Sequence, residues 1–317
     1  MDNMPLVSVG IPTYNRPQGL KKTLECITNQ TYTNLEIIVS DNCSSDPQVK
    51  EIIEAFTKKD KRIKYYRQET NIGPTKNFEF VLKQSTGEYF MWACDDDEWE
   101  NSYIFECIRV FMKERDAVAV TTACYFVHNP TKGDRIVVKN LNTLGINSFV
   151  EKVKIFIHYM YNSPNTSFYS IYKSDILKTC RLKNYFGSDW GFILQVLQYG
   201  DFVSSTNKVL YTYFYSGISS GSLDDLKKYL QIKSMFHKYF FVSLHLPFLL
   251  IEIYQLKMIS FWDRIKAMII TVYLYIRKRI YFLQVAAEIS SLFKKIIHYL
   301  SQKLRKLTTL LIRKFTF

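Results

Sequence analysis

The sequence lacks the residue patterns that mark several protein classes. It has six cysteines but no Cys-x-x-Cys pair and no regular spacing, so we expect reduced, cytosolic thiols rather than a disulfide framework. Glycine and proline are few, with 11 and 8 residues, and there is no repeat or low-complexity tract. The composition is therefore that of a globular chain.

Long hydrophobic runs are also missing. The longest uncharged apolar run near the C-terminus covers residues 239–251, which is 13 residues, and it contains His245 and Pro247. A membrane-spanning helix needs about 20 apolar residues, so this run favours a buried or interfacial helix. The N-terminus has no basic stretch followed by a long apolar one, and we expect no secretory signal.

Two ligand-binding patterns are absent as well. The chain contains no Gly-x-Gly-x-x-Gly motif, which argues against a Rossmann-type dinucleotide cofactor. The histidines show no metal-site spacing, and we expect all five in the core or at the surface: His128, His158, His237, His245 and His298.

Charge is distributed unevenly along the chain. The net charge is +13, and residues 224–317 hold 17 Lys and Arg against 5 Asp and Glu. Residues 1–223 hold the other 25 basic and 24 acidic residues and are nearly neutral. We therefore expect a globular body over 1–223 and a basic region over 224–317 that needs its own explanation.

Short apolar runs and helical patterns alternate in the first hundred residues. The expected strands are 6–11, 35–40, 62–68 and 88–93. The intervening helices open on Pro17, Pro47 and Pro74, which suits proline in a first helical turn. This alternation predicts βαβ units, a mostly parallel sheet and an α/β fold. Further along we expect a helix over 102–115, a strand over 117–127, a second α/β stretch over 148–215, and helices beyond 224.

Polar segments follow three of the expected strands, at residues 12–16, 41–46 and 94–98. Ligands of such sheets bind beyond the carboxyl ends of the strands, so we expect the segments to meet at one edge. The last segment contains Asp95, Asp96 and Asp97 directly after an apolar strand. Their charges repel unless a proton or a cation neutralises them, and Mg²⁺ or Mn²⁺ suits such ligands. The alternative is an acidic first turn of the following helix.

Four motifs occur in an order and spacing typical of one enzyme family. They are VSVGIPTYNRP, ITNQTYTNLEIIVSDNCSSD, NIGPTKNFEFVLKQSTGEYF and CDDDE, and they cover roughly residues 5–110. Together they resemble the signatures of family-2 inverting glycosyltransferases with the GT-A fold. The resemblance implies a nucleoside-diphosphate sugar as donor and Mg²⁺ or Mn²⁺ as cofactor. We expect a nucleotide-sugar-binding half over 1–115, an acceptor half over 116–223, and a helical, basic, amphipathic region over 224–317.

The resemblance assigns roles to individual residues of the donor site. Seven positions match the family's nucleotide-binding segments: Pro12, Thr13, Tyr14, Asp41, Asn71, Lys76 and Asn77. The first three would line the base and ribose pocket, and Asp41 would accept a hydrogen bond from the base. Lys76 matches a basic position near the nucleotide, which the two asparagines would help to orient.

The acidic triplet matches the family's Asp-x-Asp motif with one departure. Counting from Gly-Glu-Tyr places the first aspartate of the motif at Cys94, whose thiol is a poor ligand for a hard cation. The resemblance implies that Asp95 reaches the ribose, that Asp96 binds the metal, and that Asp97 helps directly or through water. The assignment stays open by one position.

Residues 185–202 resemble the family's segment that carries the catalytic base, with Asp189 at the base position. An inverting displacement needs a group that takes the acceptor hydroxyl's proton on the face opposite the leaving group. The alternative is that Ser188 or Asp189 only caps a helix. A later stretch, where the family often carries a histidine, has Tyr215 and Ser216 instead.

The segment from Leu292 onward has the pattern of a basic amphipathic helix. Its apolar stripe is formed by Phe293, Ile296, Ile297, Leu300, Leu304, Leu307 and Leu311. Such a helix suits the surface of an anionic membrane, while the alternative is packing on the catalytic domain or a partner chain. No nucleic-acid-binding motif accompanies the charge, and we expect no nucleic acid partner.

These features lead to one main hypothesis. The protein would be an inverting glycosyltransferase of surface-polysaccharide biosynthesis (capsule, O-antigen or lipooligosaccharide), cytoplasmic and peripheral on the membrane. Its acceptor would be a saccharide or a lipid-linked saccharide. The alternatives are a catalytically weak nucleotide-sugar-binding scaffold and an adaptor that acts through the basic tail.

Overall fold

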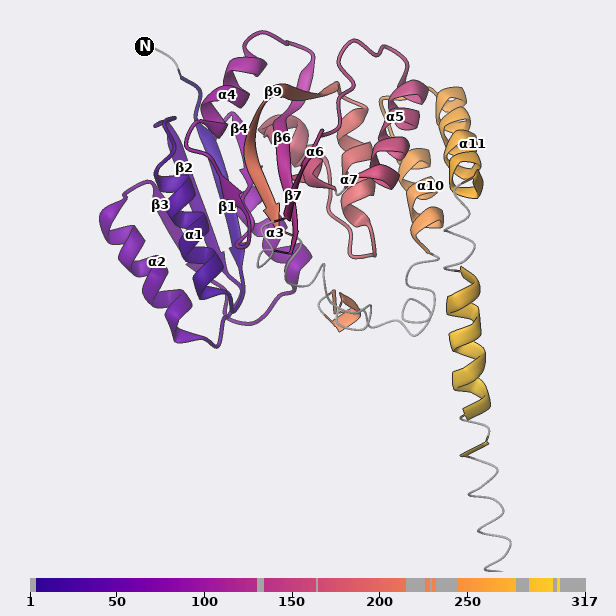
Figure 1. Cartoon of the computed structure of the whole chain (residues 1–317), viewed down its shortest axis with the longest axis horizontal. Helices are drawn as coiled ribbons and strands as arrows, with labels where there is room; N and C mark the ends of the chain where they lie inside the picture. Colours follow the sequence, from indigo (N-terminus) through magenta and orange to yellow (C-terminus); the bar gives the residue numbers. More distant parts are fainter. Residues whose placement is uncertain are drawn as a thin grey trace, which may run out of the picture.

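The computed structural model describes residues 4–129, 134–163, 165–214, 226–228, 230–231, 244–277, 285–298 and 301–302. Helices flank a sheet that runs through most of this part of the chain (Figure 1). The strands are β1 (Val7–Thr13), β2 (Leu35–Asp41), β3 (Ile63–Arg67), β4 (Tyr89–Trp92), β5 (Glu98–Trp99), β6 (Ala117–Asn129), β7 (Asp134–Val138), β8 (Ile171–Lys173) and β9 (Asp201–Phe214). The helices are α1 (Pro17–Thr28), α2 (Pro47–Lys59), α3 (Pro74–Gln84), α4 (Tyr103–Phe111), α5 (Phe149–Asn162), α6 (Ser174–Thr179), α7 (Ser188–Leu197), α10 (His245–Gln255) and α11 (Phe261–Arg277). A 3₁₀ turn covers Thr166–Tyr169, and a further helix covers residues 285–298.

The sheet joins two halves of the molecule. Its order in the described residues is β3-β2-β1-β4-β8-β6-β9-β5, and β7 pairs with β6. The strands β3, β2, β1 and β4 run parallel, whereas β8 is antiparallel to both β4 and β6. In the second half β6 and β9 pair in parallel. The α/β fold predicted from the alternating pattern is confirmed.

Both faces of the parallel half are covered, which explains its apolar strands. Every residue of β1 and of β2 is buried. Along β2 the side chains alternate between the faces: Ile37 and Val39 pack in the same cluster as Leu20 of α1, while Ile38 packs with Val81 of α3.

The predicted helix starts are confirmed. Helices α1, α2 and α3 each carry proline at their N-terminal end. The side chain of Asp46 also caps α2, because it accepts a hydrogen bond of 2.9 Å from the Gln48 amide. The helix expected over 102–115 is shorter and ends at Phe111.

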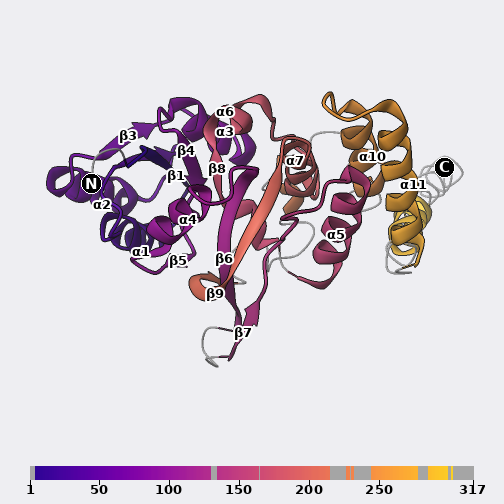
Figure 2. The same ribbon diagram turned by 90° about the horizontal axis from the view of Figure 1, so that it is seen from above.

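Helices α10 and α11, which fall in the basic region of the sequence, pack against the second half of the molecule (Figures 1 and 2). Leu249, Ile253 and Ala267 are fully buried, in one cluster with Phe192 of α7 and Phe156 of α5. The predicted positions Leu300, Leu304, Leu307 and Leu311 of the tail stripe lie outside the described residues. None of the helices in the described ranges combines the length and apolar character needed to cross a bilayer.

Candidate active site

A cavity of about 1030 Å³ opens beyond the carboxyl ends of β1 and β4. Its wall on the side of the parallel half includes Pro12, Thr13 and Tyr14, followed by Asn42 and Asn71. The wall across from them comes from α7, α10 and α11 and is formed by Asp189, Trp190, His245 and Tyr275. As predicted, residues from the polar segments after β1, β2 and β4 meet at one edge of the sheet.

Arg16 and Asp95 form the charged centre of the cavity together with Asp96. One guanidinium nitrogen, Nη1 of Arg16, lies 3.2 Å from Oδ1 of Asp95 and 2.7 Å from Oδ2 of Asp96. The other Asp95 oxygen accepts a hydrogen bond of 2.7 Å from the Thr13 hydroxyl. Burial raises the pKa of Asp95 to about 6, although the charge of Arg16 opposes that shift. The two carboxylates thus converge on one nitrogen of a guanidinium cation.

The positions of Asp95 and Asp96 can be compared with the needs of the Mg²⁺ or Mn²⁺ ion that the family resemblance implies. Two carboxylate oxygens that meet one cationic nitrogen can also face one divalent ion, and Mg²⁺ often uses only one or two carboxylates plus substrate phosphates. Within the described residues no group of three or more His, Cys, Asp or Glu side chains could hold a metal by itself. The donor set fits an ion that is shared with a phosphate ligand. Cys94 lines the same cavity, and burial raises the pKa of its thiol, which keeps it protonated.

Asp97 lies behind this centre and does not line the cavity. The Tyr211 hydroxyl donates to its Oδ2 at 2.5 Å, and the Phe214 amide donates to its Oδ1 at 3.2 Å. Burial raises the pKa of this carboxyl. These bonds tie the loop after β4 to β9, and β5 follows directly. Because α4 begins only at Tyr103, the alternative that the triplet forms the first turn of that helix is wrong.

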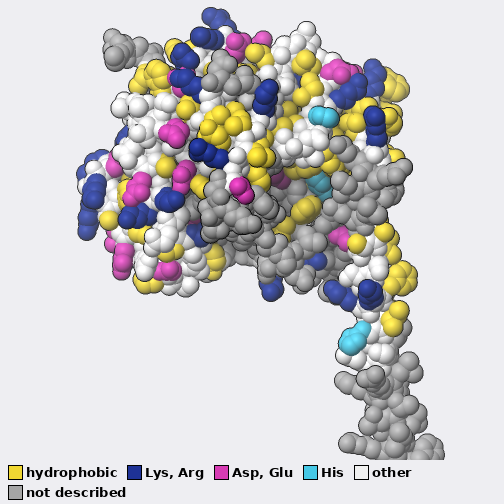
Figure 3. Space-filling model, viewed as in Figure 1, with side chains coloured by type: hydrophobic (Ala, Val, Ile, Leu, Met, Phe, Trp, Pro, Cys, Tyr) yellow, Lys and Arg dark blue, Asp and Glu magenta, His cyan; other side chains and the backbone are white. Residues whose placement is uncertain are grey.

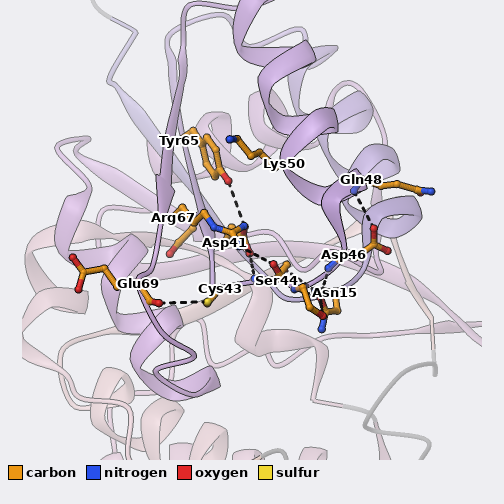
Figure 4. A network of polar contacts seen from close by, with 12 residues as sticks. Asn15, Asp41, Cys43, Ser44, Asp46, Gln48, Lys50, Tyr65, Arg67 and Glu69 are labelled. Carbon is orange, nitrogen blue, oxygen red and sulfur yellow. Dashed lines mark hydrogen bonds and ion pairs between the residues drawn. The ribbon is translucent and has the colours of Figure 1, made fainter.

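Asp41 also lies in the interior rather than on the cavity wall (Figure 4). Its Oδ2 contacts Nη1 of Arg67 at 2.5 Å and the Tyr65 hydroxyl at 3.3 Å, and its Oδ1 accepts from the Ser44 amide at 2.8 Å. This network orders the turn after β2. Asn15 closes the turn from the other side, since its Oδ1 accepts from the Ser45 amide at 2.8 Å.

Of the other residues predicted for the donor site, the two asparagines line the cavity and the lysine does not. Asn71 lines the cavity, and its Oδ1 accepts a hydrogen bond of 3.1 Å from the Asn42 side chain. Asn77 also lines the cavity and anchors α3, because it accepts from the Ser40 hydroxyl at 2.6 Å. Lys76 is exposed and does not line the cavity.

Asp189 lies in the first turn of α7 and faces the cavity. The side-chain amide of Asn165 donates a short hydrogen bond to its Oδ2. Burial raises the pKa of Asp189, which favours proton uptake. The N-cap position of α7 is Gly187, in the left-handed region at φ 75°, so neither Ser188 nor Asp189 is the N-cap residue. Tyr215 and Ser216 lie outside the described residues.

His245 is a cavity residue that the sequence did not reveal. It is buried, its Nδ1 lies 3.1 Å from the Tyr275 hydroxyl, and its ring meets Trp190 edge to face with centroids 4.6 Å apart. Burial lowers the pKa of His245 to about 4. A Cβ atom at Gly187 would come within 2.4 Å of its Nε2. The ring therefore packs directly on the turn that precedes Asp189.

Comparison with known proteins gives matches to sugar-transferring enzymes. The model of the family described as Glycosyl transferase family 2 matches residues 8–176, which is more than half of the chain. Over 96 residues the chain is 44% identical to the GalNAc(5)-diNAcBac-PP-undecaprenol beta-1,3-glucosyltransferase of Campylobacter jejuni, covering 30% of this chain and 31% of that protein. Over 100 residues it is 34% identical to the putative colanic acid biosynthesis glycosyl transferase WcaA of Escherichia coli, covering 31% of this chain and 35% of that protein. The matches thus span about a third of the length of these curated relatives.

Solved structures resemble the chain over a larger part of its length. S. aureus TarS 1-349 in complex with UDP-GlcNAc has a TM-score of 0.62 and 18% identity, covering 85% of this chain and 72% of that chain. The mannosyltransferase PcManGT from Pyrobaculum calidifontis, in complex with GDP-Man and Mn²⁺, has a TM-score of 0.57 and 13% identity, covering 99% and 84%. At these identities the likeness concerns the fold, and it agrees with the fold type that the sequence motifs implied.

Proposed function

The chain belongs to glycosyl transferase family 2, and we propose that it moves a sugar from a nucleoside-diphosphate sugar to an acceptor hydroxyl with inversion at the anomeric carbon. The observation that carries this proposal is that Asp95, Asp96 and Asp189 line one cavity. The first two suit a diphosphate with its cation, and the third suits a base.

The nucleotide would lie against the carboxyl ends of β1 and β2. Thr13 and Tyr14 line that wall, and the Tyr14 ring is 41% exposed and so is available for stacking. Asn42 and Asn71 offer amide groups beside it. Asp41, with its partner Arg67, would act indirectly by ordering the turn after β2.

A divalent cation, Mg²⁺ or Mn²⁺, would be held by Asp96 with Asp95 beside it and by the diphosphate. When bound, it supplies positive charge that stabilises the leaving nucleoside diphosphate. Asp95 would also reach the ribose. Asp97 would hold the loop in place through Tyr211, and Arg16, the partner of Asp96, would add positive charge beside the phosphates.

The acceptor hydroxyl would approach from the side of α7. Asp189 would take its proton as the acceptor oxygen bonds to the anomeric carbon and the bond to the diphosphate oxygen breaks. The amide of Asn165 fixes one carboxylate oxygen of Asp189. The raised pKa of Asp189 makes it a stronger base than an exposed aspartate.

The biological setting we propose is surface-polysaccharide biosynthesis at the cytoplasmic face of a membrane, with peripheral attachment. The names of two relatives support it, because one concerns an undecaprenol-linked substrate and the other colanic acid biosynthesis. The basic region over 224–317 supports attachment to anionic lipid. A lipid-linked saccharide is therefore our preferred acceptor.

A thermal-shift screen of nucleotide sugars, with and without Mn²⁺, tests the donor site. The matching nucleotide sugar at about 100 times its Kd should stabilise the full chain by about 2.7 kcal/mol. Asp96→Asn should abolish the Mn²⁺-dependent part, whereas Asp134→Asn, at an exposed position of β7, should not.

Asp189→Asn separates binding from catalysis, because it should keep the donor-induced stabilisation and lose turnover. If no nucleotide sugar stabilises the protein, the donor site is wrong. Stabilisation of the unaltered chain without any turnover would favour the scaffold alternative.

A further inference from the structure

The side of α11 that points away from the core is an apolar stripe. Trp262, Ile269, Tyr273 and Ile276 recur at helical spacing and are 70%, 64%, 53% and 50% exposed. We call these four residues the outer face of α11. A helix packed on a soluble core normally has polar residues on that side, so the stripe needs an explanation.

The inner side of the same helix reaches the active-site cavity. Ala267, Thr271 and Tyr275 are buried against the molecule, and the Tyr275 hydroxyl meets His245 at the cavity wall. A helix with its side chains is about 10–12 Å across. The outer face of α11 is therefore separated from the cavity by the thickness of one helix.

Neighbouring elements extend the apolar surface. Ile251 and Tyr254 of α10 and Met258 in the following turn are 46%, 55% and 65% exposed. The helix over 285–298 adds Phe293 and Ile297, at 59% and 64%. In Figure 3 hydrophobic side chains line the right-hand edge of the molecule, over α11 and the helix that follows it, with Lys and Arg among them. Single exposed apolar residues are ordinary, whereas a contiguous group marks an interaction surface.

The charged residues on α10, α11 and the helix over 285–298 indicate which kind of partner fits this apolar surface. Lys257, Lys266 and Arg277 are exposed on or beside α11, and Lys294 and Lys295 follow on the next helix. The acidic residues in α10 and α11 are already engaged, since Glu252 is buried with Lys183 and Asp263 lies 3.7 Å from Lys266. A symmetric pair of copies would bring these cations against each other, which disfavours self-association. An anionic lipid surface satisfies the apolar stripe and the cations together.

We propose that the outer face of α11, with Tyr254 and Met258 beside it, docks on anionic lipid. Trp262 and Tyr273 then lie at the headgroup level, where aromatic residues are favoured. The cavity wall made by Tyr275 and His245 then faces the lipid across one helix. An acceptor carried on a lipid enters from this side; that consequence rests on the proposed function, while lipid binding itself does not.

Co-sedimentation of the full chain with vesicles tests the proposal. Phosphatidylcholine vesicles that contain phosphatidylglycerol should bind the protein, and vesicles of phosphatidylcholine alone should bind it much more weakly. Trp262→Ser and Ile269→Ser should each weaken binding about tenfold or more, as expected when a large apolar side chain is lost from the contact. Met112→Ser is the matched control, because Met112 is 73% exposed at the end of α4, and it should bind like the unaltered chain.

Three results would overturn the proposal. The first is unchanged binding in both α11 variants, with loss of binding only in Lys294→Gln/Lys295→Gln. The second is dimerisation of the unaltered chain, by light scattering, that Ile269→Ser abolishes. The third is equal binding to neutral and anionic vesicles. The variants' thermal stabilisation by nucleotide sugars, measured without vesicles, reports separately on the donor site. If that stabilisation is absent and α11-dependent lipid binding holds, the proposed function fails and the docking surface stands.

Discussion

Arg16→Met is the substitution that most directly probes the charged centre of the cavity. The guanidinium of Arg16 is the shared partner of Asp95 and Asp96, at 3.2 and 2.7 Å. Its removal leaves two neighbouring carboxylates facing each other, and Asp95 is largely desolvated. A divalent cation placed between them would restore the lost attraction.

The size of the effect follows from burial. Removing one partner of a fully buried ion pair costs about 3–5 kcal/mol. The Arg16 side chain is 31% exposed and that of Asp96 is 26% exposed, so solvent weakens the pair. Proton uptake by Asp95 also relieves part of the repulsion. We therefore expect a loss of about 1–2 kcal/mol at pH 8, or a Tm lower by about 2–8 °C.

Thermal unfolding with a Mn²⁺ titration measures this. Saturating Mn²⁺ should return most of the lost stability to Arg16→Met and should stabilise the unaltered chain less, because Arg16 competes for the same carboxylates. Arg62→Met is the matched control: Arg62 pairs with Asp60 at 2.6 Å with similar exposures of 27% and 16%, far from the cavity. Equal rescue of both variants by Mn²⁺, or an Arg16→Met variant as stable as the unaltered chain, would refute the reasoning.

Three further substitutions address other parts of the site. Asp189→Asn should lower kcat by a factor of about 10² or more. In the unaltered protein, kcat should fall with decreasing pH at a pH above the ordinary aspartate pKa. The reason is that burial raises the pKa of Asp189 and only its ionised form is a base. His245→Leu should reduce the acid sensitivity of the folded protein. Burial lowers the pKa of His245 to about 4, whereas the unfolded chain takes up the proton near 6.5, so the unaltered protein loses up to about 3 kcal/mol of stability between pH 6.5 and 4. Urea unfolding across this pH range checks it, and an unchanged pH slope in the variant would contradict it. Gly19→Ala should lower Tm and weaken donor-induced stabilisation, because the new Cβ would come within 1.9 Å of the Asp95 carbonyl oxygen; retention of both values would contradict it.

The first half of the fold was predictable because its signals are local. Strands with both faces buried read as continuous apolar runs, and prolines mark the helix starts at Pro17, Pro47 and Pro74. The rule that ligands bind at the carboxyl ends of parallel strands also predicted that segments 12–16, 41–46 and 94–98 meet, and Thr13, Asn42 and Asp96 do line one cavity. The predicted bounds differ from the observed ones by at most four residues, as where β1 continues to Thr13.

The partners of the site residues were not predictable, because they come from distant parts of the chain. Tyr211 holds Asp97 from 114 positions away. His245 reaches the turn before Asp189 from α10, and no residue next to either one hints at the contact. The two-residue strand β5 is too short for any periodicity to reveal.

The loop that bears the acidic triplet is anchored at several points along its length. The Thr13 hydroxyl donates a hydrogen bond to Asp95, and the Thr23 hydroxyl donates to the Cys94 carbonyl at 2.8 Å. The Tyr211 hydroxyl of β9 donates to Asp97. If the proposed cation binds at this loop, the carboxylates have little freedom to adjust their spacing, so a larger ion such as Ca²⁺ should fit poorly. A substitution in a remote strand, at Tyr211 for example, should then change which cation the proposed site prefers, although Tyr211 would not contact that cation.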